Sequence, residues 1–150
     1  MNVCGVEIKG SEAILCLLSL EDDVFHLPEC RARKLTFGKN GSAKSLKAFQ
    51  AEFAKLMQDY KFTHVVIKER PTKGKFAGGA AGFKLEAAIQ LIDELNVELL
   101  SPTDKKALLK RNPIPISFNE TGLKIFQQEA FETAYALLMQ IKYPNAIEQD

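Results

Sequence analysis

Two apolar runs lie so close together at the start of the sequence that they limit the folds open to this chain. The first covers Asn2 to Ile8 and the second Ala13 to Leu20, with a turn at Lys9-Gly10-Ser11 between them. Two parallel neighbours in a sheet need a crossover of about a dozen residues or more, whereas an antiparallel pair needs only a tight turn. The two runs therefore predict a β-hairpin, which disfavours a purely parallel sheet.

The rest of the chain alternates between strand and helix patterns. Further strands are expected at Lys34 to Phe37, His64 to Lys68 and Val97 to Leu100. Apolar residues at helical spacing predict helices from Ser42 to about Tyr60, through Leu85 to Ile92, from Lys105 to Arg111 with Thr103 as a candidate cap, and from about Glu120 to Ile141. Residues 71–82 between the strand at 64–68 and the second helix read as a Gly- and Lys-containing loop. This order is typical of an α/β domain with a mixed sheet of about five strands, the first three antiparallel, flanked by helices.

Composition supports one globular domain spanning residues 1–150. The chain is 46% hydrophobic and 26% charged, which suits a protein with a buried core. Its formal net charge is only +1, so affinity for a polyanion must come from local patches.

The cysteines and the N-terminus indicate a cytoplasmic protein with no membrane partner. Three cysteines without metal-type spacing disfavour both a disulfide framework and a zinc site. The N-terminus resembles no secretory signal, and no apolar stretch approaches the roughly 20 residues that span a bilayer.

Acidic side chains mark three of the predicted elements. Glu7 lies on the first strand, and Glu69 follows the strand at 64–68 directly. Glu129 and Glu132 are three residues apart on the last helix, so they project to the same side of it. Acids on a helix most often form its solvent face, so Glu129 and Glu132 have that ordinary interpretation as well.

Three short segments resemble the ribonuclease H-like superfamily, and within it the Holliday-junction resolvase (RuvC-type) branch. Gly5-Val6-Glu7 followed by Gly10-Ser11 is similar to the first-strand motif of the superfamily. Residues 65–69 resemble the fourth resolvase strand, which ends in an acidic residue. Residues 129–137 resemble the terminal resolvase helix, which carries two acidic residues three positions apart. In element order the resemblance covers nearly the whole chain, which is also similar to a small family of bacterial proteins assigned to this superfamily.

The resemblance implies a metal-dependent nuclease that acts on structured or single-stranded nucleic acid without reading bases. In such sites carboxylates hold two Mg²⁺ or Mn²⁺ ions about 4 Å apart. A set of carboxylates without His or Cys suits these hard ions. By resemblance Glu7, Glu69 and Glu132 are the metal ligands, and Glu129 is a further catalytic candidate. The resemblance also allows a homodimer, because resolvases act as dimers on two-fold symmetric junctions.

The same residues support an alternative, a catalytically inactive ribonuclease H-like domain that binds nucleic acid or a protein. The first-strand and helix acids are Glu where the family has Asp. Lys9 and Lys68 stand beside the proposed ligands, where they could neutralise the carboxylates in place of a metal. A nucleotide- or sugar-phosphate-binding protein of the kinase or actin type ranks last, because one domain lacks the second lobe that those proteins need.

Basic residues form two local patches. The first is free of acids and contains Arg31, Arg33, Lys34, Lys39, Lys44 and Lys47. The second surrounds the Gly-containing loop, and its candidate nucleic-acid contacts are Arg70, Lys73, Lys75, Phe76 and Lys84. Lysine and arginine bind phosphates without sequence specificity, and an aromatic ring stacks on unpaired bases. The alternative for both patches is a solvated surface.

Overall fold

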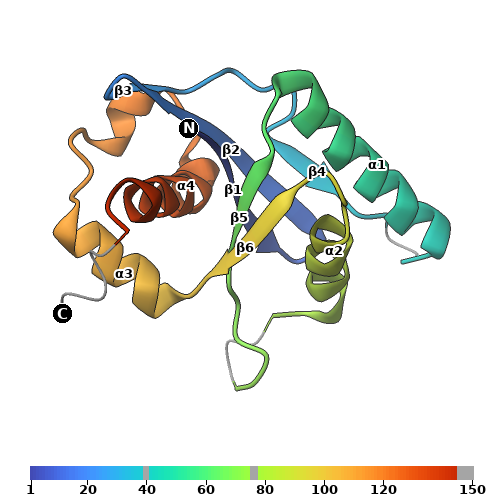
Figure 1. The fold of residues 1–150 in the computed structure, drawn as a ribbon. Coiled ribbons are helices and arrows are strands. Elements are labelled where there is room, and N and C mark those ends of the chain that lie inside the picture. The colour runs from blue at the N-terminus through green and yellow to red at the C-terminus, as the bar shows by residue number, and fades with distance from the viewer. Residues whose placement is uncertain (39–40, 75–77, 145–150) are drawn as a thin grey trace.

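The computed structural model describes residues 1–38, 41–74 and 78–144 and has the predicted α/β architecture (Figure 1). A mixed sheet lies at the centre and helices cover both of its faces. No helix within these residues is long and apolar enough to cross a bilayer.

The predicted hairpin forms the middle of the sheet. β1 (Asn2–Lys9) pairs antiparallel with β2 (Glu12–Glu21) and parallel with β5 (His64–Lys68), which in turn pairs parallel with β6 (Asn96–Leu100). The outer edge of β2 pairs antiparallel with β3 (Val24–His26) and β4 (Lys34–Thr36). The order is β3-β2-β1-β5-β6, with β4 beside β2.

Over the described part of the chain the sheet has six strands, one more than the sequence predicts. The missed strand is β3, which is three residues long and contains no fully buried residue. So short and exposed a segment carries no hydrophobic period that could reveal it.

Helices α1 (Ala43–Tyr60) and α2 (Ala80–Gln90) cover one face of the sheet, and α4 (Gln128–Lys142) covers the other, with α3 (Pro102–Arg111) beside it (Figure 1). As predicted, α1 begins after Ser42, whose hydroxyl accepts a hydrogen bond from the backbone N–H of Ser45 at 3.1 Å. The start of α2 falls inside the segment that the sequence predicts to be loop.

Two predicted helix starts are wrong. In α3 the cap is Ser101 rather than Thr103, since the Ser101 hydroxyl accepts from Asp104 N at 3.1 Å and Pro102 takes the first helical position. The last helix begins at Gln128 rather than near Glu120. Two 3₁₀ turns, η1 (Phe118–Thr121) and η2 (Ile125–Gln127), precede it, and Gly122 between them has φ +77°, which ends helical winding.

Alternation along β1 separates the core into two layers. Cys4, Val6 and Ile8 pack with α1 and α2, whereas Val3 packs with α4. Gly5 also faces α4, and the approach is so close that a Cβ on Gly5 would lie 2.0 Å from the carbonyl oxygen of Ala130. The next residue on this face is Glu7, so the fold brings Glu7 to the N-terminal part of α4.

Candidate functional site

Glu7 lies near the end of β1, on the face of the sheet that α4 covers. Its side chain is only 9% exposed. In the β1–β5 register Val6 is opposite Ile67, so Lys68 is the next residue along β5 beside Glu7. The Lys68 Nζ lies 3.6 Å from the Glu7 Oε2, which forms an ion pair within the sheet.

Two acids of α4 join this pair through the same lysine and a second one. Lys68 Nζ lies 3.2 Å from Glu129 Oε2. Lys105 Nζ, delivered by α3, lies 2.5 Å from Glu129 Oε2 and 3.5 Å from Glu132 Oε1. We call these five residues, Glu7, Lys68, Lys105, Glu129 and Glu132, the Glu–Lys centre.

Charges in the Glu–Lys centre nearly balance. Three carboxylates face two ammonium groups, which leaves one net negative charge when all five groups are ionised. Partial burial opposes ionisation of Glu129, but the hydrogen bonds and charges of Lys105 and Lys68 outweigh it and lower the pKa of Glu129. Lys105, whose side chain is 9% exposed, is the most buried cation of the centre.

Glu69 does not join the centre. Successive side chains of a strand point to opposite faces, and Lys68 takes the face of Glu7. The negative charge of Glu69 instead contributes to raising the pKa of Glu86 on α2, after burial as the main cause. The backbone N–H of Glu69 donates to the carbonyl of Leu100 at 2.9 Å, and within the described residues its carboxylate makes no ion pair with Lys68 or Lys105, the cations of the centre.

Sequence reasoning identified Lys68 as a counter-charge but missed Lys105. A signal was present, because Lys105 precedes Leu108 by one helical turn, and Leu108 is fully buried. Lys105 therefore had to lie on the buried side of its helix. Lys9, the other lysine named from the sequence, is exposed.

The arrangement does not fit a two-metal site. A metal ion bound by these carboxylates would need the space and the oxygen lone pairs that the two ammonium groups use. Over residues 1–38, 41–74 and 78–144 no group of three or more Asp, Glu, His or Cys side chains is arranged to hold a metal ion.

Arg70 is partly buried against α2. Its guanidinium stacks on the ring of Phe83 at 4.4 Å. A Cβ on Gly78 or Gly82 would lie 2.7 or 2.5 Å from its Nη1, so the guanidinium packs directly against both glycines. Its Nε and Nη2 are buried without a hydrogen-bond partner among the described residues. These contacts hold the guanidinium against α2, and phosphate binding by Arg70 stays a prediction.

The other predicted nucleic-acid contacts differ in their surroundings. Lys73 and Lys84 are exposed, whereas Lys75 and Phe76 lie outside the described residues. In the first patch Arg31 pairs with Asp59 at 2.8 Å and Lys34 with Glu12 at 3.5 Å. Arg33, Lys44 and Lys47 of this patch are exposed. Its last member, Lys39, lies outside the described residues.

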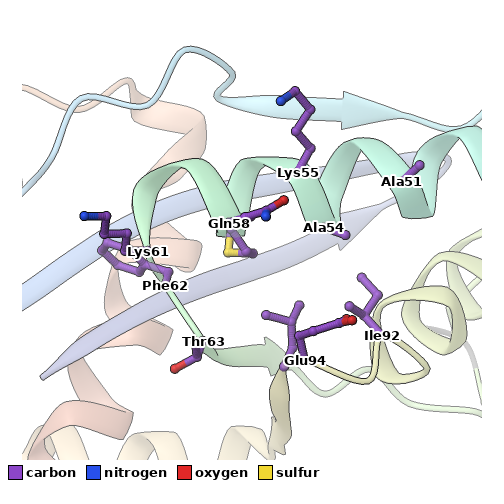
Figure 2. Close-up of a pocket in the computed structure, with 11 residues that line it drawn as sticks. Ala51, Ala54, Lys55, Gln58, Lys61, Phe62, Thr63, Ile92 and Glu94 are labelled. Carbon is purple, nitrogen blue, oxygen red and sulfur yellow. The ribbon is translucent and has the colours of Figure 1, made fainter.

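A cavity of about 630 Å³ lies on the opposite face of the sheet, between α1 and the segment that joins α2 to β6 (Figure 2). Small residues of α1, Ala51 and Ala54, leave this space beside Ile92. No residue of the Glu–Lys centre lines it, so the cavity is separate from that centre.

Solved structures with the same fold define the class of this protein. Thermus thermophilus RuvC superposes with a TM-score of 0.74 at 13% identity, over 96% of this chain and 97% of RuvC. RuvC in complex with a Holliday junction substrate gives 0.73 at 12% identity, over 95% and 96% of the two chains. The yeast mitochondrial Holliday junction resolvase Ydc2 gives 0.54 at 9% identity, over 98% and 83%. The chain therefore has the ribonuclease H-like fold in its resolvase form.

Within that class the sequence identifies the family. Residues 1–137 match the model of the family described as "Protein of unknown function (DUF3010)", and the chain belongs to it. No curated protein matches the sequence.

Proposed function

We propose that this protein binds nucleic acid as a resolvase-type domain, and that lysines rather than divalent metal ions hold its carboxylate centre together. The observation that carries the proposal is the position of Lys68 and Lys105 among Glu7, Glu129 and Glu132. Of the two functions that the sequence suggests, this geometry favours the non-cleaving one.

Metal ions and the two lysines would compete for the carboxylates of the Glu–Lys centre. A metal pair could enter only if both ammonium groups left their carboxylates. Lys105 is the harder to displace, because its side chain is 9% exposed, whereas that of Lys68 is 28% exposed.

Nucleic acid as the ligand is supported by the fold and by charges around the centre. A structure with the same fold is described in complex with a Holliday junction substrate. Lys9 is the last residue of β1, two residues after Glu7, and Lys73 lies in the segment that follows β5. These exposed lysines can bind phosphates at the edge where β1 and β5 end. On this proposal the protein is a single cytoplasmic domain, and dimerisation stays a prediction.

Metal-dependent cleavage is the second candidate, and one observation favours it. Glu7, Glu129 and Glu132 converge on one site, as the resemblance implies. Cleavage would require that Mg²⁺ or Mn²⁺ displace both lysines, and that Glu69 or another ligand complete the site.

A binding and cleavage assay separates the two candidates. Labelled four-way junction, RNA–DNA hybrid and single-stranded DNA are titrated with protein in EDTA and in Mg²⁺ or Mn²⁺, at several salt concentrations. We expect salt-dependent binding that persists in EDTA, and no product with either ion. Products that need the ion and vanish in Glu7→Gln would establish the nuclease instead. Absence of binding to every substrate at low salt would refute the proposed function.

A further inference from the structure

The short turn η2 ahead of α4 leaves two large apolar side chains exposed to different degrees. Ile125 is 83% exposed and Phe126 is 36% exposed. Together they form a small apolar patch on the surface.

The buried side-chain amide of Gln127 holds the turn in place. The side chain of Gln127, which is buried, donates from Nε2 to the carbonyl of Leu15 at 2.9 Å. Its Oε1 accepts from the backbone N–H of Lys124 at 3.0 Å, and the Gln127 N–H donates back to the Lys124 carbonyl at 2.9 Å. Because both ends of the amide are used, the backbone of the turn cannot rotate to bury Ile125 and Phe126.

The strand registers place this turn beside the Glu–Lys centre. Ile14 of β2 is opposite both Glu7 of β1 and Lys34 of β4, so the three residues form one row across the sheet. Lys34 Nζ lies 5.0 Å from the centre of the Phe126 ring. Neighbouring strands are about 4.8 Å apart, so Lys34 lies roughly 10 Å from the backbone of Glu7.

The charge and the size of the patch formed by Ile125 and Phe126 indicate the kind of ligand that it binds. Lys124 is exposed next to Ile125, and Arg33 and Lys34 are exposed at the N-terminal end of β4. Apolar and aromatic faces beside cationic side chains suit an unpaired base attached to phosphates. Two side chains are far too small for a stable protein partner, which buries about 800 Å² on each side.

We infer that Ile125 and Phe126 form a stacking platform for unpaired bases of a single-stranded or branched nucleic acid, with Lys124 binding a flanking phosphate. Lys34, which is paired with Glu12 at 3.5 Å, lies over the Phe126 ring and supports it from one side. This inference rests on the proposed function and names its substrate class.

The test compares the double variant Ile125→Ala/Phe126→Ala with Leu91→Ala. Leu91 is 73% exposed at the end of α2, on the other face of the sheet, so it controls for loss of an exposed apolar group. Fluorescence anisotropy measures binding to a single-stranded oligonucleotide and to a blunt duplex over a salt series.

We expect the double variant to lose about 10-fold or more in single-strand affinity, the loss typical of one stacked base. Duplex affinity and the salt slope should not change, because no charge is removed. Lys124→Gln should instead reduce the single-strand salt slope by about 0.7. An oligonucleotide with 2-aminopurine should lose fluorescence on binding to the wild type and not to the double variant.

Three results would overturn the inference. Equal single-strand affinity of the wild type and the double variant would show that Ile125 and Phe126 do not stack on bases, and would leave the proposed function intact. A wild-type dimer that the double variant converts to a monomer would make the patch an interface between copies of the chain. Failure of the wild type to bind any nucleic acid would refute the proposed function, and the platform with it.

Discussion

Lys105→Met tests the Glu–Lys centre, because methionine keeps an unbranched apolar side chain of nearly the same length and removes the ammonium group. Among the described residues, the change leaves Glu129 paired with Lys68 alone, at 3.2 Å. Within the same residues Glu132 keeps only the hydrogen bond from Gln128 Nε2 at 3.2 Å. Two carboxylates one helical turn apart then repel each other with less compensation.

The expected loss follows from burial. Breaking a fully buried ion pair costs about 3–5 kcal/mol, whereas an exposed pair contributes about 0–1 kcal/mol. The Glu129 side chain is 43% exposed and that of Glu132 24%, so water replaces part of the lost interaction. We therefore expect a loss of about 2 kcal/mol at pH 7. For a chain of this length that lowers Tm by about 4–8 °C.

The loss should depend on pH with a definite sign. Because the pKa of Glu129 is lowered in the folded protein, its ionised form stabilises the fold above the ordinary glutamate pKa of about 4.3. That contribution disappears as pH falls through the lower, folded-state pKa. The difference between wild type and Lys105→Met should be constant from pH 7 to about 5 and shrink below about 4.3.

Urea unfolding of wild type, Lys105→Met and Lys106→Met measures these differences. Lys106 is the exposed neighbour on α3, and its replacement should change stability by less than about 0.5 kcal/mol. Equal stability of the two variants at pH 7 would refute the reasoning, because Lys105 would then contribute no more than a surface lysine.

Two further substitutions and one labelling experiment probe the packing of the core. Gly5→Ala should destabilise the fold by about 3 kcal/mol or more in urea unfolding, since its Cβ would lie 2.0 Å from the Ala130 carbonyl oxygen; a neutral effect would contradict the close packing of α4 on β1. Gln127→Leu leaves the Leu15 carbonyl without its side-chain partner and should cost about 2 kcal/mol by the same measurement, whereas wild-type stability would show that the amide does not fix the turn. Burial raises the pKa of Cys16 to about 12, so iodoacetamide at pH 8 should modify it only after unfolding, and labelling of the native protein, detected by mass spectrometry, would contradict its burial.

The fold could be predicted because its decisive features are local. The short turn between the first two apolar runs requires an antiparallel pair, and β5 has the predicted bounds, His64–Lys68. The start of α4 could not be found in the same way. Leu123 and Phe126 continue the apolar spacing of the helix toward the N-terminus, although Gly122 and the 3₁₀ turn hold them outside it.

The site was only partly predictable, because its membership depends on which face each residue takes. Val65, Val66 and Ile67 are all buried, so β5 has no polar alternation that could show whether residue 68 or 69 lies beside Glu7. Only the pairing of β5 with β1 decides in favour of Lys68. The spacing of Lys105 from Leu108 indicates only the buried side of α3, whereas its contact with Glu129 depends on the long-range packing of α3 against α4.

Calorimetric titration with Mn²⁺ tests the central claim most directly. The wild type and the double variant Lys68→Met/Lys105→Met are compared, with Glu7→Gln as the control for binding at the centre. We predict that the wild type gives no heat beyond dilution and that the double variant, with three unpaired carboxylates, gains a binding site. Stoichiometric Mn²⁺ binding by the wild type that Glu7→Gln abolishes would contradict the account.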